Sequence, residues 1–378
     1  MKPAVRISSR NPRGALALAA LALGLGGGCG TDPPAATTIE ISPASAVLAD
    51  AGLTSQLTAT VRDQHGRAMT DVAVAWSSSD SLIAQISEDG LVTGREAGTA
   101  TVRASVDALT AAATVTVELG PRAVLRTVFR ETDGENWVNS RNWMTNAPLD
   151  SWYGVSTDAL GNIIQLLLDG NELRGPIPPE LGVLANFQVL NLSRNALTGP
   201  IPSKLGNLAN LQWLDLSNNA LTGPVPPELA NLANLEALSL GANDLTGPVP
   251  PQLGNLANLQ LLDLSANGLT GPVPPELGNL ANLQLLNLGA NELTGPVPPQ
   301  LGNLANLGIL DLFSNELTGS LPRDLIGLPL WVFYWNDTGL CAPADSAFQD
   351  WLDSISNHRP NRNCDSGSPS ARPGRRAA

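Results

Sequence analysis

The sequence predicts a mainly β protein in which a β-sandwich is followed by a solenoid of stacked coils with capped ends. Three observations support this fold class. Residues 37–119 alternate apolar and polar side chains, residues 163–330 repeat a 24-residue pattern, and the segments flanking the repeats combine helical spacing with clustered aromatic residues. A period of two is typical of half-buried strands, and a fixed period of roughly 20 to 50 residues is typical of solenoids.

Residues 1–29 predict an export signal. Their basic start contains Lys2, Arg6, Arg10 and Arg13. The apolar run from residue 15 to residue 25 that follows is too short to cross a bilayer as a helix, and this combination is typical of secretory signals.

The end of this signal, Gly26-Gly-Gly-Cys29, resembles the lipobox of bacterial lipoproteins, whose cysteine is diacylated and becomes the new N-terminus. The resemblance implies a lipid anchor at Cys29 and an exported protein held at the outer membrane or cell surface. Residues 30–36, which contain proline and alanine, are expected to be a short tether between the lipid and the next domain. We expect no other contact with the membrane. The alternative is an ordinary signal peptide with an incidental cysteine.

The charge balance bears on the class of partner. The chain has a formal net charge of −13, and residues 163–330 contain 13 acidic and 4 basic residues, a net charge of −9. Nucleic acids and bare anionic membranes attract clustered lysine and arginine, so this balance disfavours both. An extracellular protein with a basic patch, or a neutral polysaccharide, fits better.

Residues 37–119 predict an antiparallel sandwich, with alternation in segments such as Val72, Val74 and Trp76 and turns at Asp89-Gly90 and Ala97-Gly98. The segments Gln56-Leu-Thr-Ala-Thr-Val61 and Asp89-Gly-Leu-Val-Thr-Gly94 resemble the bacterial immunoglobulin-like domain of group 2. Such domains occur in surface adhesins and as spacers. We favour the spacer role and place Trp76 in the core.

Residues 120–162 predict a cap. Val124, Leu125, Val128 and Phe129 have helical spacing, and three tryptophans follow in loop-like sequence, namely Trp137, Trp143 and Trp152. The stretch is similar to the N-terminal cap of plant-type leucine-rich repeats. We interpret the tryptophans as the core of this cap; the alternative is a platform on which sugars stack.

Seven units of 24 residues follow over residues 163–330, each marked by an asparagine. These asparagines are Asn171, Asn195, Asn219, Asn243, Asn267, Asn291 and Asn315. The leucines of one unit are too few to form a core alone, so neighbouring units must stack. An asparagine side chain both donates and accepts hydrogen bonds, which predicts a structural ladder at the turn after each strand.

The element Leu-Thr-Gly-Pro-Val-Pro, as at residues 269–274, resembles the plant-specific subclass of leucine-rich repeats, found in receptor-kinase and polygalacturonase-inhibitor ectodomains. The resemblance covers about half the chain and implies a curved right-handed solenoid with a concave binding face.

Side chains between the inward leucines are expected on the concave face, on eight strands spanning roughly 34 Å. One outward column contains Gln165, Val189, Trp213, Ala237, Leu261, Leu285, Ile309 and Phe333. Its neighbour contains Leu167, Asn191, Asp215, Ser239, Asp263, Asn287, Asp311 and Trp335. An apolar stripe beside an acidic one is typical of a binding surface.

The candidate ligand-binding residues on this face are Val189, Asn191, Trp213, Asp215, Leu261, Asp263, Leu285, Asn287, Ile309, Asp311 and Phe313. Among its aromatic residues, Trp213, Phe313, Phe333 and Trp335 are candidate anchors. Two alternatives remain: the repeats were copied with little selection on their surface, and Phe333 and Trp335 close the end of the solenoid.

Residues 331–365 predict a degenerate repeat and a C-terminal cap. The isolated pair Cys341 and Cys364 in an exported chain predicts one disulfide, which stabilises this end by roughly 3 kcal/mol. A helix over residues 344–355 is expected to cover the solenoid with Phe348, Trp351, Leu352 and Ile355. Residues 366–378, rich in serine, proline and arginine, are expected to be disordered.

We expect no enzyme. The chain has two histidines, His65 and His358, without evident catalytic partners, and we expect no metal site or cofactor. The leading hypothesis is a cell-surface binding or adhesion protein that uses its concave face. The alternatives are an envelope spacer without a defined ligand and, third, an enzyme acting on polysaccharides.

Overall fold

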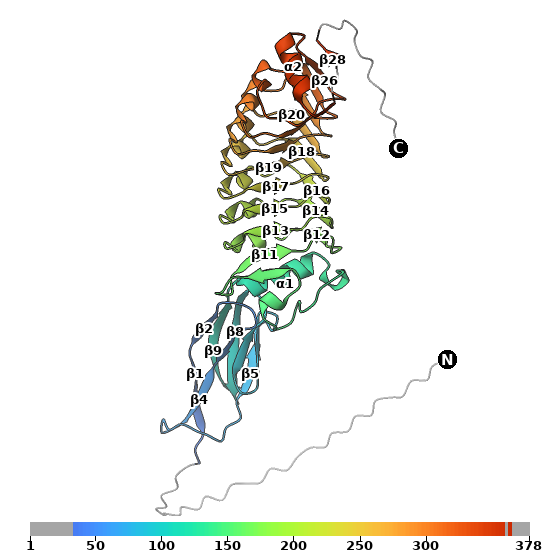
Figure 1. Cartoon of the computed structure of the whole chain (residues 1–378). Coiled ribbons are helices and arrows are strands. Elements are labelled where there is room, and N and C mark those ends of the chain that lie inside the picture. Colours follow the sequence, from blue (N-terminus) through green and yellow to red (C-terminus); the bar gives the residue numbers. More distant parts are fainter. Residues whose placement is uncertain (1–32, 360–361, 365–378) are drawn as a thin grey trace, which may run out of the picture.

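The computed structural model describes residues 33–359 and 362–364 of the chain. A β-sandwich is followed by a cap and a long stack of coils, as the sequence predicts (Figure 1). Residues 1–29 with Cys29, and residues 366–378, lie outside the described residues. Among the helices that are described, none has the length and apolar character needed to cross a bilayer.

The sandwich contains nine strands. They are β1 (Ala36–Ser42), β2 (Ser45–Leu48), β3 (Thr54–Gln56), β4 (Thr58–Asp63), β5 (Ala75–Ser78), β6 (Ala84–Ile86), β7 (Leu91–Gly94), β8 (Gly98–Val106) and β9 (Leu109–Val117). They form the sheets β1-β4, β2-β9-β8-β5 and β3-β7-β6. Most pairs are antiparallel, but β2 runs parallel to β9, which differs from the purely antiparallel sandwich we expected.

The alternating side chains meet in one core, where Leu57, Val92, Val102 and Val115 are fully buried. Trp76 is partly buried and packs against this core. Strand β5 begins only at Ala75, so Val72 and Val74 precede the strand that their alternation predicted.

The cap contains α1 (Pro121–Glu131), the single turns η1 (Gly134–Asn136) and η2 (Leu149–Ser151), and β10 (Val155–Thr157). Its three tryptophans, Trp137, Trp143 and Trp152, are buried and in mutual contact, with ring centroids 4.7 and 5.2 Å apart. They form the aromatic core that the sequence predicted, which disfavours the sugar platform because stacking a sugar needs an exposed ring face.

The carboxylate of Asp50 joins the sandwich to the cap. Its two oxygens accept hydrogen bonds from the backbone N–H groups of Arg122 (2.8 Å) and Ala123 (2.9 Å) in the first turn of α1. A carboxylate at this position satisfies N–H groups that have no partner within the helix and interacts favourably with the helix dipole. Asp50 therefore ties the sandwich to the start of α1.

One parallel sheet lines the concave side of the solenoid. After β10 it contains β11 (Ile163–Leu167), β13 (Val189–Asn191), β15 (Trp213–Asp215), β17 (Ala237–Ser239), β19 (Leu261–Asp263), β21 (Leu285–Asn287), β23 (Ile309–Asp311), β25 (Val332–Tyr334) and β27 (Asn357–Arg359). These ten strands correct our count of eight. The two caps each add one: β10, which is antiparallel to β11, and β27.

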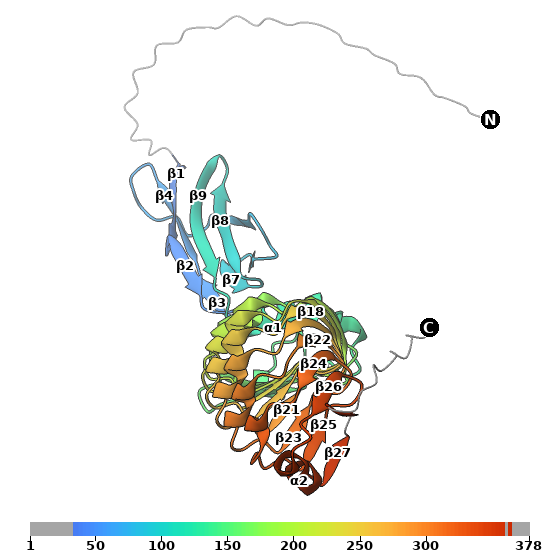
Figure 2. The same ribbon diagram turned by 90° about the horizontal axis from the view of Figure 1, so that it is seen from above.

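The Thr-Gly-Pro side of each coil forms a second sheet that the sequence did not lead us to expect. It contains β12 (Arg174–Pro176), β14 (Ala196–Pro200), β16 (Ala220–Gly223), β18 (Asp244–Pro248), β20 (Gly268–Pro272), β22 (Glu292–Gly295), β24 (Glu316–Ser320), β26 (Gly339–Ala342) and β28 (Arg362–Asn363). Seen from above, the coils overlap and shift progressively from α1 toward α2 (Figure 2).

Short helical turns complete each coil. They are η3 (Pro179–Val183), η4 (Ser203–Asn207), η5 (Pro227–Asn231), η6 (Pro251–Asn255), η7 (Pro275–Asn279), η8 (Pro299–Asn303) and η9 (Arg323–Leu325). Gly254 allows the turns to stack closely, because a Cβ at this position would lie 2.2 Å from the carbonyl oxygen of Glu276 in the next coil.

The repeated asparagines form the ladder that the sequence predicted. The Oδ1 of Asn267 accepts from the N–H of Leu245 (3.0 Å), and its Nδ2 donates to the carbonyls of Leu240 and Leu264 (both 3.1 Å). Each asparagine thus joins its own coil to the one before it. The repeated leucines of successive coils, such as Leu262 and Leu269, are fully buried and form one continuous core.

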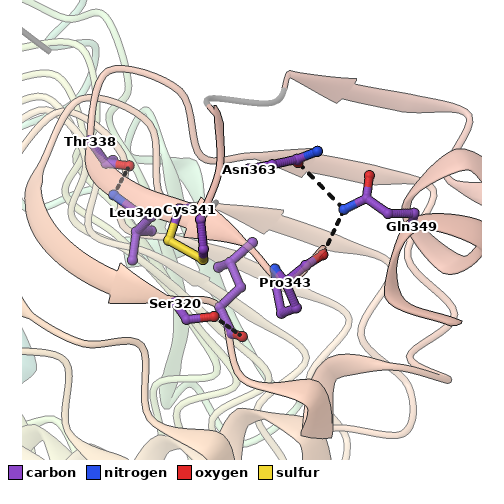
Figure 3. Close-up of a disulfide and its surroundings, with 9 residues drawn as sticks. Ser320, Thr338, Leu340, Cys341, Pro343, Gln349 and Asn363 are labelled. Carbon is purple, nitrogen blue, oxygen red and sulfur yellow. Dashed lines mark hydrogen bonds between the residues drawn. A yellow bond between two sulfur atoms is a disulfide. The ribbon is translucent and has the colours of Figure 1, made fainter. Parts of the chain in front are cut away.

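The C-terminal cap closes the core as predicted. Helix α2 (Ser346–Ser354) buries Phe348, Trp351 and Leu352, and Ile355 just after it is also buried. Cys341 and Cys364 form the expected disulfide between β26 and the end of the described chain (Figure 3). Gln349 of α2 donates a 2.7 Å hydrogen bond to the carbonyl of Pro343 beside it.

Candidate functional site

The concave sheet places the two predicted columns side by side from β13 to β23. The first column contains Val189, Trp213, Leu261, Leu285 and Ile309, and the second contains Asn191, Asp215, Asp263, Asn287 and Asp311. The parallel pairing is in register throughout, so equivalent side chains follow one another at about 4.8 Å. Trp213 is the most exposed of these residues, at 47%.

The last repeat departs from our prediction. Strand β25 pairs Val332 with Ile309 and Tyr334 with Asp311, so Phe333 and Trp335 point into the core and are fully buried. Their place in the two concave columns is wrong, and the alternative that both residues close the end of the solenoid is confirmed. The cause is one missing residue: Leu328-Pro-Leu330 stands where the preceding unit has Leu304-Ala-Asn-Leu307. A shift of one residue exchanges the two faces of a strand.

An open apolar cleft of about 510 Å³ follows the first column from Trp213 to Trp331. Ala237, which is smaller than its column neighbours and buried, leaves a hollow between Trp213 and Leu261. Leu285 and Ile309 continue the apolar surface toward β25.

Trp331, which is 56% exposed, bounds the far end of this cleft, and our sequence reasoning missed it. Its indole lies against Gly308, where a Cβ would come within 2.6 Å of the indole Nε1. Gly308 occupies a position that holds glutamine or glutamate in the four preceding units, at residues 212, 236, 260 and 284. This break in the repeat was the available signal.

A polar band borders the cleft on the side where the strands begin. Gln212, Glu236, Gln260 and Gln284 alternate with asparagines around a groove of about 530 Å³. The asparagines form a second ladder, in which Nδ2 of Asn258 donates to the carbonyl of Ala233 at 2.9 Å. Asn210, Asn234, Asn282 and Asn306 repeat the same bond. The band therefore presents ordered amide groups to solvent.

The acidic column has a structural role as well. Oδ1 of Asp215 accepts hydrogen bonds from the backbone N–H (3.0 Å) and hydroxyl (2.7 Å) of Ser217, and Asp263 does the same with Ser265. Within the part of the chain that the structure describes, the second oxygen of each carboxylate accepts no hydrogen bond. These oxygens remain able to bind a cationic group.

Asp311 and Phe313 lie at the far end of the acidic column. Burial raises the pKa of the Asp311 carboxyl, and the charge of Asp263 acts in the same direction. The hydrogen bond from the Phe313 N–H (2.9 Å) and the charge of Arg359 act in the opposite direction. Phe313 is half-buried and does not line the apolar cleft.

Residues 33–359 and 362–364 contain no group of three or more histidine, cysteine, aspartate or glutamate side chains placed to hold a metal ion. His65 lies in a sandwich loop, and His358 lies in β27, where its Nδ1 is 3.2 Å from the carbonyl of Ile355.

Family profiles match both parts of the chain. The profile described as Bacterial Ig-like domain (group 2) matches residues 35–117. Profiles described as leucine-rich repeat match residues 185–245, 258–280 and 282–304. No curated protein matches the sequence.

Several solved structures are similar to this chain. The structure of PEPR1–AtPEP1 is 33% identical, with a TM-score of 0.54, over 59% of this chain and 32% of that chain. The LRR ectodomain of the receptor kinase GASSHO1/SCHENGEN3 from Arabidopsis thaliana, in complex with Casparian strip integrity factor 2, is 31% identical, with a TM-score of 0.46, over 63% and 34% of the two chains.

An LRR protein from Leptospira interrogans is 33% identical, with a TM-score of 0.41, over 50% and 47% of the two chains. This chain thus spans about a third of the length of the first two structures. The chain carries a bacterial Ig-like domain of group 2 followed by leucine-rich repeats.

Proposed function

We propose that this protein binds an extended polypeptide segment of a protein partner along the concave face of its solenoid. The observation that carries the proposal is the apolar cleft bounded by two exposed tryptophans, Trp213 and Trp331. Five strand spacings separate β15 from β25, which is about 24 Å. An extended peptide of roughly seven residues has this length.

The charges of this face indicate the chemistry of the partner. From β13 to β23 the two columns and the polar band contain the carboxylates of Asp215, Glu236, Asp263 and Asp311 and no lysine or arginine. A segment that combines apolar residues with lysine or arginine would fill the cleft and pair with these carboxylates. Complementary charge also accelerates encounter between partners.

The comparisons support a binding role. The PEPR1–AtPEP1 structure, which is similar to this chain over 59% of its length at 33% identity, is named after two molecules, PEPR1 and AtPEP1. We therefore propose a binding protein and not an enzyme. An envelope spacer without a ligand is the competing function.

A peptide selection tests this function and requires no candidate partner. A random library displayed on phage is selected on the full chain and counter-selected on the double variant Trp213→Asp/Leu261→Asp. We expect enriched peptides that carry apolar and basic residues and bind the double variant at least about 30-fold more weakly, because loss of a central aromatic anchor costs about 2 kcal/mol or more.

The matched control is Thr222→Asp/Thr246→Asp, which places the same charges on exposed positions of the second sheet. This control should bind the selected peptides as the wild type does. If both double variants bind them equally well, or if no peptide is enriched on the wild type, the spacer function is favoured.

We further propose that the protein is exported and held at the cell envelope by a lipid on Cys29, with residues 30–36 as the tether. The lipobox-like sequence before Cys29 supports this anchor. Labelled palmitate should enter the wild type and not Cys29→Ala. Equal labelling of the two proteins would show that Cys29 carries no lipid.

A further inference from the structure

We propose a second binding site, for an organic monocarboxylate with an apolar body, in the cleft between the sandwich, the cap and the first coil. This cleft has a volume of about 630 Å³, and all its lining residues precede the concave columns of β13 to β23 in the sequence. Volumes of roughly 300 to 1,000 Å³ are typical of small-molecule sites. All three units contribute to its walls: Leu82 and Arg95 from the sandwich, Arg126 and Arg130 from α1, and Glu180 from η3.

Among the three arginines of α1, Arg126 has the weakest contacts. Its neighbours on the same face of α1 are satisfied: Arg122 donates to the carbonyls of Thr145 and Ala147 (both 2.9 Å), and Arg130 forms an ion pair with Glu96. Arg126 has only a 3.4 Å contact with Asn146, and its Nε is buried without a hydrogen bond. A buried donor without a hydrogen bond is rare in folded proteins, and a group bound in the cleft would give this donor a partner.

The electrostatics of the cleft agree with this geometry. Burial lowers the pKa of the Arg126 guanidinium, and the positive charges of Arg122 and Arg95 act in the same direction, against Asp50 and Glu96. An anion beside Arg126 would offset both effects. A carboxylate suits the planar guanidinium because the two can form parallel hydrogen bonds.

The charge of the lining limits the ligand to a single carboxylate. Arg95, Arg126 and Arg130 line the cleft together with Glu96 and Glu180, which gives a formal charge of +1. A ligand with several negative charges would meet the two glutamates without enough cations to balance it. A monoanion leaves the occupied cleft neutral.

Apolar side chains at the rim of the cleft indicate that the ligand has an apolar body. Leu82, Leu119 and Met144 are exposed at 67%, 37% and 43%, and all three line the cleft. Met144 has a φ of 61°, a left-handed conformation that is uncommon for a residue with a long side chain and that holds it at this rim. Exposed apolar side chains that gather around a cationic centre fit a ligand with an acidic head and an apolar remainder.

The test uses the full chain and three probes that separate charge from shape. They are 3-phenylpropionate, its uncharged amide, and acetate, each titrated against the protein in ligand-observed NMR. We expect saturable binding of 3-phenylpropionate and at least ten-fold weaker binding of the other two. N-acetyl-alanyl-phenylalanine distinguishes the two sources of such a carboxylate: tighter binding than 3-phenylpropionate would assign the cleft to a peptide C-terminus, and weaker binding to a free acid.

Two variants locate the site. Arg126→Gln removes the charge and should weaken 3-phenylpropionate at least ten-fold, whereas Arg103→Gln, at an exposed arginine of β8 outside the cleft, should not. Leu82→Asp changes a well-exposed side chain, so it leaves the fold intact, and it should abolish binding by repelling the carboxylate. Equal affinity for the acid and its amide, or unchanged binding by Arg126→Gln and Leu82→Asp, would overturn the proposal.

Discussion

Asn243 shows how one side chain holds a coil in place. Its Oδ1 accepts from the N–H of Leu221 (3.0 Å), and its Nδ2 donates to the carbonyls of Leu216 (3.1 Å) and Leu240 (3.0 Å). Asn243→Ala leaves these backbone groups without partners in the interior. We expect the free energy of unfolding to fall by about 3 kcal/mol, measured by urea denaturation.

The second asparagine ladder supplies a matched control. Asn234 is exposed and makes a single 2.8 Å bond to the carbonyl of Ala209, so Asn234→Ala should cost less than about 1 kcal/mol. Similar losses for the two variants would show that the inner ladder has no special structural role.

Asp311 predicts a pH dependence of stability. Because burial raises the pKa of its carboxyl in the folded state, the folded protein holds this proton over a pH range in which the unfolded chain has lost it. The contribution of Asp311 to stability therefore decreases as pH rises from the ordinary pKa of aspartate to the raised value. Above the raised pKa the folded protein holds an ionised, partly buried carboxylate, and the resulting loss of stability is complete.

The variant Asp311→Asn replaces the carboxylate with a neutral amide, so it removes the free-energy cost of burying a charge. Asn287 shows that an amide fits the column, since its Oδ1 accepts from the N–H of Gly289 at 3.1 Å. We expect Asp311→Asn to be more stable than the wild type at pH 7 and to lose this advantage in acid, as measured by urea denaturation across pH. An advantage that stays constant with pH would contradict this account.

At the scale of the coil, one residue in each turn adopts a left-handed conformation. Ala242, Ala266 and Ala290 have φ values of 54°, 51° and 54°, just before the ladder asparagines. Alanine in this conformation costs roughly 1 kcal/mol, which glycine avoids at a smaller entropic cost. Ala266→Gly should therefore raise the free energy of unfolding by about 0.5 kcal/mol.

The control for this substitution is Ala257→Gly, at an exposed position of the preceding coil that is not left-handed. It should lower stability slightly, because glycine adds freedom to the unfolded chain. If both glycine variants lower stability, the left-handed turn carries no strain. Calorimetric melting of the two variants decides between these outcomes.

The coils also show how far the sequence could predict the structure. The 24-residue period fixes the register of the concave strands from β13 to β23, because every unit must place its leucines in the shared core. It fails at β25, where one residue is missing and Phe333 and Trp335 turn inward. It also gave no indication of the second sheet, because Thr-Gly-Pro lacks the alternation that signals a strand.

At the scale of the whole molecule, the contacts between its parts cannot be predicted from the repeat pattern of the sequence. Asp50 lies 72 residues before Arg122, yet its carboxylate fixes the first turn of α1 and with it the junction between sandwich and solenoid. Of the candidate site, the two concave columns follow from strand alternation. The position of Trp331 beside Gly308 does not, because it depends on how the last coil packs on its neighbour.

A polypeptide partner that lies in the concave cleft must cover the tryptophans at its two ends. Oxidation of tryptophans by hydroxyl radicals, read out by mass spectrometry, tests this directly, because Trp213 and Trp331 are exposed whereas Trp137, Trp143, Trp152, Trp335 and Trp351 are buried. With a selected peptide bound at saturation, oxidation of Trp213 and Trp331 should fall several-fold while that of partly buried Trp76 stays constant. Unchanged oxidation of Trp213 and Trp331 under saturation would contradict the account.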